Sequence, residues 1–179
     1  VLVTDSYEYN NPREDRILSW DFTIDNEEFS VGPATVLGNP TLYQVESIQA
    51  DKHYQTLLVA EEMKEHHKVM ALDLMTGEVI KEDLGNFDRG NDPEGIALVV
   101  NKNNNGYWIC TEQSKTDNRF HLYDRKTLEY MTTMYLDNVS YTDGIATAYM
   151  HGKWFLYAVD NDARLSLIHI SEPTRRRGI

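Results

Sequence analysis

A repeat of about 48 residues is the feature that most constrains the fold of this chain. Each copy begins with an acidic residue that leads a short apolar run (ESIQAD, EGIALV and DGIATA), and these acids are Glu46, Glu94 and Asp143. A second apolar run follows each and ends in a polar residue, at Glu62, Gln113 and Asp160. The runs are rich in β-branched and aromatic residues and are bounded by turn-forming residues, as short antiparallel strands are. A repeat of this length built only from short strands predicts a β-propeller, in which each repeat is one four-stranded blade.

The acids that lead the first runs occupy equivalent positions in successive repeats. Because equivalent positions in a propeller surround one axis, Glu46, Glu94 and Asp143 should converge at the mouth of the central channel. Asp92 stands two residues before Glu94, so in an extended chain both side chains leave the same face. Mutual repulsion makes such a cluster costly unless cations are bound. The alternative interpretation is that each acid is a solvated turn residue.

Several segments together resemble the calcium-dependent β-propeller phytase family, in the family's order and at about its spacing. They are QVES with LVAEE, DPEGI, GYWICTEQ with LYDR, and YTDGI, within a match that covers residues 1–164. The resemblance implies an all-β fold, a β-propeller fragment of about three four-stranded antiparallel blades from a six-bladed ring. We expect residues 1–164 to form this partial domain. The family typically has glycine after the first glutamate, where this chain has Ser47.

Residues 165–179 do not continue the repeat. They carry three arginines and one acid in a chain whose formal net charge is −12. The segment looks like translated read-through of an adapter or vector, and we predict that it is a non-native tail; the alternative is a basic tail of the protein itself. Its arginines are therefore not counted as phosphate ligands.

The resemblance also assigns site residues, all of them oxygen donors at strand ends or in the loops beside them. The implied metal ligands are Glu46, Glu62, Asp92, Glu94, Gln113, Asp137 and Asp143. The residues expected at the cleavage site are Glu46, Asp92, Glu94 and Asp143. Asp137 is included because it stands six residues before Asp143, as a further calcium-ligating Asp does in the family. Glu61 could replace Glu62 if the strand ended one residue earlier.

Calcium is the cofactor that these residues and the resemblance imply, because it takes about six to eight oxygen ligands. Clustered cations can bridge phosphate oxygens, neutralise charge in the transition state and lower the pKa of a bound water. The resemblance implies a 3-phytase-like phosphomonoester hydrolase that removes phosphate from myo-inositol hexakisphosphate (phytate), bound as a calcium salt. The sequence has no GxSxG, GxxxxGK[ST] or HExxH motif that would indicate another hydrolytic mechanism.

Charge and composition limit the partners. The net charge of −12 argues against nucleic acid, and no apolar run approaches the 20 or so residues of a membrane span. No signal peptide is visible at Val1. The resemblance implies a small-molecule substrate, a monomeric parent protein and a secreted or periplasmic location.

Two other functions stay open at this point. A calcium-dependent lactonase or esterase on a propeller needs a central cation with few carboxylates, so the acid-rich ring disfavours it. A non-catalytic propeller that binds a partner is the second alternative, because a fold alone does not imply a function.

A few remaining side chains could carry chemistry, and we expect them not to. His66 and His67 are adjacent and lack a third ligand at a suitable spacing, so we predict solvated loop histidines. Cys110 lies inside an apolar strand and should be a buried thiol. Four basic loop residues near the expected site are predicted to be solvated rather than to bind phosphate: Lys64, Arg89, Lys115 and Arg119.

Overall fold

The computed structural model describes residues 2–4, 12–38, 40–88, 90–136 and 139–161, together with the backbone of residues 164–170. Within these residues every regular element is a β-strand, which confirms the predicted all-β fold. Consequently, the described part of the chain has no helix that could cross a membrane.

The centre of the molecule consists of two four-stranded antiparallel sheets in which strands follow one another in chain order. The strands of the first are β6 (Val45–Asp51), β7 (Thr56–Glu61), β8 (Lys68–Asp73) and β9 (Val79–Lys81). The strands of the second are β10 (Asp92–Val100), β11 (Gly106–Gln113), β12 (Arg119–Asp124) and β13 (Tyr130–Tyr135). Each sheet corresponds to one copy of the sequence repeat.

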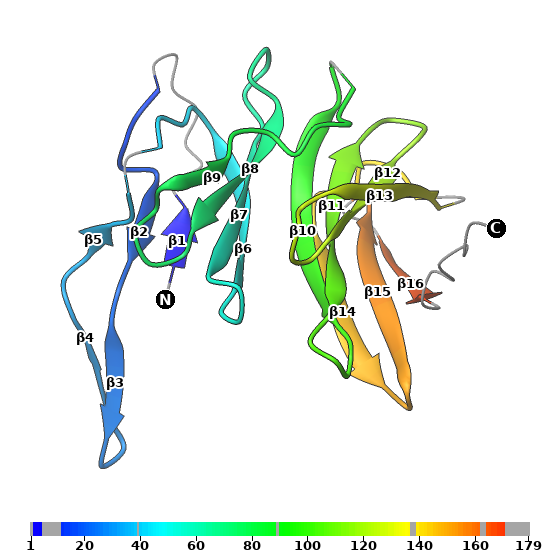
Figure 1. Ribbon diagram of the computed structural model, residues 1–179. Coiled ribbons are helices and arrows are strands. Elements are labelled where there is room, and N and C mark those ends of the chain that lie inside the picture. The colour runs from blue at the N-terminus through cyan, green and yellow to red at the C-terminus, as the bar shows by residue number, and fades with distance from the viewer. Residues whose placement is uncertain are drawn as a thin grey trace.

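A three-stranded sheet flanks this pair on either side. One contains β1 (Leu2–Thr4), β2 (Ile17–Ser19) and β5 (Thr35–Val36), and the other β14 (Ile145–Met150), β15 (Lys153–Asp160) and β16 (Arg164–Ile170). A separate hairpin, β3 (Phe22–Asp25) with β4 (Glu28–Val31), projects from the three-stranded sheet that contains β2 and β5 (Figure 1). The described residues thus form two complete blades and two three-stranded sheets, where the sequence predicted about three complete blades.

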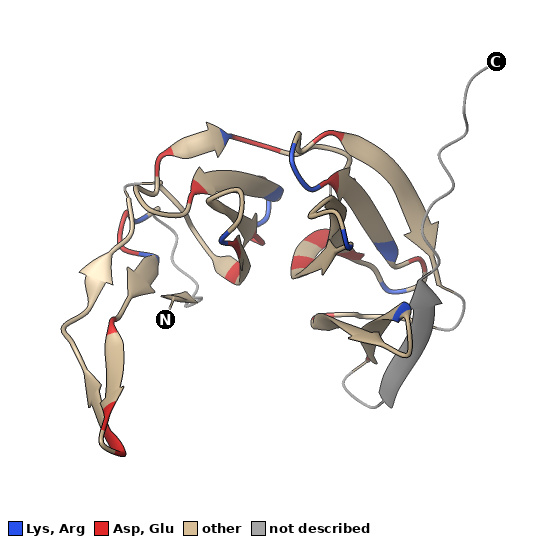
Figure 2. Ribbon diagram, turned by 60° about the horizontal axis from the view of Figure 1, so that its bottom comes forward, with Lys and Arg blue, Asp and Glu red and all other residues tan. Residues whose placement is uncertain are grey.

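The four sheets stand side by side in an arc, as consecutive blades of a propeller do (Figure 2). The first strands of the blades lie next to one another, because β6 contacts both β1 and β10, and β10 also contacts β14. The beginnings of these strands therefore meet near one axis. This arrangement brings residues about 48 positions apart in the sequence into one place.

The hydrophobic core is divided into layers between adjacent sheets. In β7, Leu58 and Ala60 pack toward the blade that follows, whereas Leu57 and Val59 pack toward the blade that precedes. Successive side chains of a strand point to opposite faces, so a strand covered on both faces is apolar throughout. Cys110 is fully buried in the layer between the two central blades, as the sequence predicted.

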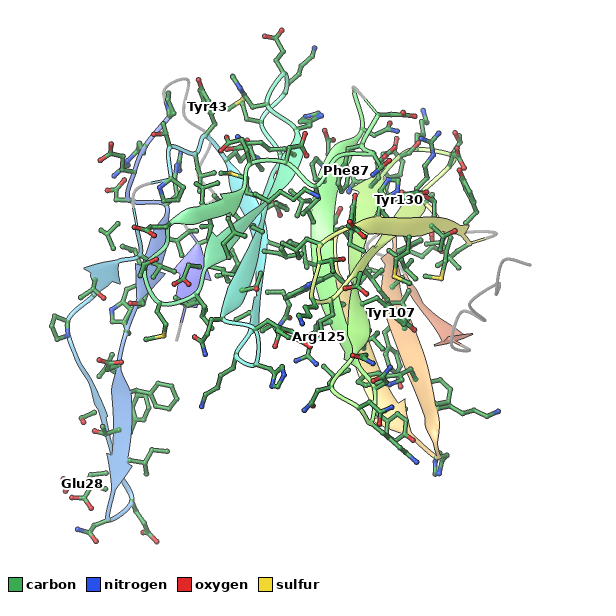
Figure 3. The ribbon with its side chains drawn as sticks, in the orientation of Figure 1. Glu28, Tyr43, Phe87, Tyr107, Arg125 and Tyr130 are labelled. Carbon is green, nitrogen blue, oxygen red and sulfur yellow. The ribbon has the colours of Figure 1, made fainter. Side chains whose placement is uncertain are left out.

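A buried ion pair joins the two central blades at the end of the sheets where β6 finishes. The carboxylate of Asp51 accepts hydrogen bonds from Arg125 Nε at 2.6 Å and from Nη2 at 2.7 Å. Burial disfavours the charged carboxylate, but its bonds with Arg125 outweigh this effect and lower the pKa of Asp51. Arg125 lies toward one end of the sheets, whereas Tyr43 and Phe87, from the loops before β6 and β10, lie toward the other (Figure 3).

The last sheet continues across the position where the sequence repeat ends. β16 starts at Arg164, and its backbone pairs with β15 from Trp154 to Asp160. The predicted boundary between residues 164 and 165 therefore falls inside a strand. That residues 165–179 are a non-native tail stays a prediction.

Candidate metal centre

Two of the expected ligands lie at β-bulges. The pairing of β6 with β7 passes from Val45 to Ser47 and leaves out Glu46. The pairing of β10 with β11 shifts between Pro93 and Ile96, the interval that contains Glu94. A bulge bends its strand and redirects the side chain of the extra residue. The two central blades therefore use the same backbone device at the same point of the repeat.

Gly95 allows the third acidic segment to approach closely. A Cβ atom at this position would lie 2.9 Å from the carbonyl oxygen of Asp143 and 2.8 Å from the backbone nitrogen of Ile145. Both are backbone atoms of the segment that leads into β14, so only glycine permits this packing. Glu94 and Asp143 are consequently held near each other although 49 residues separate them.

Three carboxylates from two blades form a compact cluster. Glu62 follows the end of β7, and Asp92 and Glu94 stand at the start of β10. One oxygen atom from each of the three lies within 4.8 Å of the others. Acidic positions gather on the facing inner sides of the two central sheets (Figure 2).

Glu94 has the most perturbed environment of the cluster. Glu94 is only 5% exposed, and this burial raises the pKa of its carboxyl group to about 9. The negative charges of Glu62, Glu46, Asp143 and Asp92 contribute in the same direction. Five acids from three consecutive blades therefore act on one another.

Glu62 and Glu46 are directly coupled. Burial raises the pKa of Glu62 to about 7, and contact with the Glu46 carboxyl and the charge of Asp92 add to the effect. The Gln44 side chain opposes it by donating a hydrogen bond from Nε2 to Glu62 Oε2 at 2.7 Å. Without a cation, therefore, the cluster cannot keep all of its carboxyl groups ionised at neutral pH, and a divalent cation would stabilise their ionised form.

The amide expected among the ligands is also present. Gln113 ends β11 opposite Asp92, and its side-chain nitrogen donates a hydrogen bond to Oδ1 of Asp143. The structure thus brings together Glu46, Glu62, Asp92, Glu94, Gln113 and Asp143. Asp137, the remaining predicted ligand, lies outside the described residues.

The hydrogen bonds of Glu61 and Ser47 show what these two residues contact. Glu61 does not replace Glu62 in the cluster, because its carboxylate accepts backbone hydrogen bonds from Tyr43 and Gln44. Ser47, which stands where the family typically has glycine, donates a hydrogen bond from its hydroxyl to the carbonyl oxygen of Glu94. The substitution therefore joins the first strands of adjacent blades.

The prediction of two solvated histidines is correct for His66 and wrong for His67. His66 is exposed and stacks on Tyr43, with ring centroids 4.0 Å apart. The side chain of His67 is only 9% exposed, and its Nε2 lies 3.1 Å from Asp92 Oδ1, although not in hydrogen-bonding geometry. The loop between β7 and β8 folds back toward β10, a contact that no local pattern in the sequence indicates.

One cavity adjoins the acidic cluster, and a second lies beside the first. One of about 300 Å³ is lined by residues that include Glu62, Asp92, Lys64 and His67. The other, of about 780 Å³, shares Lys64 and His67 with it and extends past Phe87. The smaller cavity therefore opens onto two acids of the cluster and onto Lys64, whereas the larger one is lined by further acids, Glu65, Asp83 and Asp88.

The basic residues near the site differ in availability. Lys64 and Lys115 are exposed, as predicted, and Arg89 lies outside the described residues. Arg119 is partly buried rather than solvated, because its guanidinium is paired with Asp88, with Glu112 at 3.3 Å and with Asp117 at 3.1 Å. Of the three described residues, Lys64 is the one that lines the cavities.

Comparisons with known proteins agree with the fold and the resemblance. A family model described as Phytase matches residues 24–152. No curated protein matches the chain. A solved structure titled "Structure of Dos1 propeller" is similar with a TM-score of 0.50 and 8% sequence identity, over 84% of this chain and 39% of that chain. At this identity the similarity shows a β-propeller fold alone. The match covers 39% of the length of that structure.

Proposed function

This chain belongs to the phytase family, and we propose that it carries the calcium-binding part of a 3-phytase-like hydrolase that releases phosphate from phytate. The observation that carries the proposal is the convergence of four neighbouring acids on the buried carboxyl of Glu94. A site of this kind needs divalent cations to be stable in its ionised form. Calcium ions held there are suited to a substrate that is itself a polyanion.

The residues in and around the acidic cluster fit calcium. They offer carboxylate oxygens from Glu46, Glu62, Asp92, Glu94 and Asp143 and an amide from Gln113. Oxygen donors of this type are the ones that calcium prefers, and carboxylates can bind it through one oxygen or two. By resemblance, Asp137 is a further ligand.

Each side chain has a distinct part in the proposed site. Glu94 is the most buried of the three clustered acids, Glu62 and Asp92 lie close to it, and Gln113 donates the hydrogen bond that is proposed to orient Asp143. Glu46, Asp92, Glu94 and Asp143 are proposed to border the cleavage site. Bound calcium would supply charge neutralisation for the phosphate and activation of the attacking water.

The substrate proposal follows from charge. A chain with a net charge of −12 repels phytate unless cations lie between them, so inositol phosphate is proposed to bind as its calcium salt. We also propose that the protein acts as a monomer and is secreted or periplasmic.

The test is calcium-dependent release of phosphate from phytate. Because a partial propeller can lack groups that turnover requires, the full-length parent protein is incubated with phytate in calcium and in a chelator, and free phosphate is measured; calcium binding is followed on the same sample by titration calorimetry. We expect phosphate to be released in calcium but not in chelator, and we expect Glu94→Gln to abolish this release. Calcium binding with turnover of a lactone or carboxylic ester in place of phytate, or no calcium binding at all, would overturn the proposal.

A further inference from the structure

A buried acid stands at or next to the end of the second strand in three consecutive blades. These residues are Glu61 at the end of β7, Glu112 one residue before the end of β11, and Asp160 at the end of β15. They are 1%, 0% and 4% exposed. Glu61 and Glu112 directly precede Glu62 and Gln113, and adjacent strand residues point to opposite faces, so they leave the strand away from the metal cluster.

In the first of these blades, Glu61 holds the segment that leads into β6. Its two carboxylate oxygens accept hydrogen bonds from the backbone N–H groups of Tyr43 at 2.6 Å and Gln44 at 2.7 Å. It also accepts a bond from the N–H of Met63 at 3.2 Å. Glu46 follows Gln44 by two residues, so its position depends on this anchored segment.

In the next blade, Glu112 holds the segment that leads into β10. Its carboxylate accepts the backbone N–H of Asp88 at 3.1 Å and the side-chain amide of Asn91 at 2.6 Å. His121 Nε2 lies 2.8 Å from the same carboxylate. Burial disfavours ionisation, but the bonds from His121, Asn91 and Asp88 outweigh it and lower the pKa of Glu112. Asp92 follows Asn91 directly.

In the third blade, Asp160 makes the corresponding contact with the segment that leads into β14. Its Oδ1 accepts the backbone N–H of Ser140 at 3.1 Å and the Ser140 hydroxyl at 3.4 Å. The backbone repeats the arrangement of the first blade: Asn161 donates its N–H to the Ser140 carbonyl, as Glu62 does to the Gln44 carbonyl, both at 2.9 Å. Asp143 follows Ser140 by three residues.

We propose that Glu61, Glu112 and Asp160 are positioning residues, which anchor the entry segment of each blade and thereby place the metal-facing acids that follow. Their effect on calcium affinity rests on the proposed function, whereas their effect on the entry segments does not. A carboxylate that accepts backbone N–H groups is a strong, directional anchor, and its loss leaves buried donors without a partner. Groups that orient metal ligands typically change metal affinity about 10- to 100-fold when removed.

The experiment compares these three carboxylates with a fourth that is equally buried. Asp51 is 2% exposed and bonded to Arg125, and it lies at the opposite end of β6 from Glu46. The variants are Glu61→Gln, Glu112→Gln and Asp160→Asn, with Asp51→Asn as the control. Calcium affinity is measured by titration calorimetry, stability by thermal melting, and the entry segments by amide hydrogen exchange at Tyr43, Asp88 and Ser140.

All four substitutions should lower the melting temperature, but only the three positioning variants should bind calcium about 10- to 100-fold more weakly. Amide exchange should accelerate in the entry segment of the altered blade and not in the control. If Glu112→Gln fails to fold, Asn91→Ala is used in its place. It removes the hydrogen bond that the Asn91 side chain donates to Glu112 and leaves the bonds of Glu112 with Asp88 and His121 in place.

Equal calcium affinity in the positioning variants and in Asp51→Asn, or unchanged exchange in the entry segments, would overturn the inference. If the unaltered chain binds no calcium, the proposed function fails, and the exchange measurement alone decides whether these acids anchor the segments.

Discussion

Gln113 donates a hydrogen bond to the carboxylate of Asp143, which lies 30 residues later in the chain and precedes the first strand of the next blade. Gln113 also stands opposite Asp92 in the register of β10 and β11. One amide therefore connects an acid of its own blade with an acid of the following blade. The candidate metal centre is therefore formed by neighbouring blades together.

Calcium binding should release protons near neutral pH. The pKa of Glu94 is about 9 and that of Glu62 about 7, so at pH 7.5 Glu94 is largely protonated and must lose its proton to bind a cation. We expect release of about one proton per Glu94 site, and affinity that rises from pH 6 to pH 9. Titration calorimetry in two buffers with different ionisation enthalpies measures the proton count. A count of zero at pH 7.5 would mean that Glu94 is already ionised.

The metal-free chain should lose stability as the pH rises. Because burial and neighbouring acids raise the folded-state pKa values of Glu94 and Glu62 above their usual 4.5, the folded chain binds more protons than the unfolded chain between about pH 4.5 and 9. The free energy of unfolding therefore falls through this window. Melting temperatures in chelator should drop by about 2–4 °C for each kcal/mol lost, and saturating calcium should reverse the trend. A rising melting temperature from pH 5.5 to 8.5 would contradict it.

Glu94→Gln should separate metal binding from stability. Since Glu94 is mainly neutral below its pKa of about 9, an uncharged amide should leave the metal-free melting temperature at pH 7 nearly unchanged. Calcium affinity should fall by at least about tenfold, which corresponds to roughly 1.4 kcal/mol. Thermal melts with and without calcium measure both effects. A large stability loss in chelator would instead indicate a structural role for the ionised carboxylate.

Gly95→Ala should disturb the contact between two blades. The added methyl would meet backbone atoms of Asp143 and Ile145 at 2.9 and 2.8 Å, so the blades must shift, at a cost of about 1–3 kcal/mol. Gly144→Ala is the matched control, because its nearest neighbour would be a Val159 methyl at an ordinary 3.5 Å. Chemical denaturation measures both; equal destabilisation would show that close packing at Gly95 is not the cause.

The sequence predicted well those features that depend on local periodicity. Alternating and continuous apolar runs indicated the strands, and the recurrence of Glu46, Glu94 and Asp143 at nearly equal spacing indicated that they meet at one axis. These are consequences of strand geometry and repetition, which do not depend on how distant loops pack.

The structure supplied what depends on the face of a strand and on contacts across blades. It placed Glu62 rather than Glu61 in the cluster, because the bulge at Glu46 and the end of β7 decide which of two adjacent acids faces the axis. It also placed His67 beside Asp92. In addition, it showed that Glu112 accepts a hydrogen bond from Asp88, in the segment before β10. Adjacent residues point in opposite directions along a strand, so a shift of one position changes the role of a side chain without changing the pattern that predicts the strand.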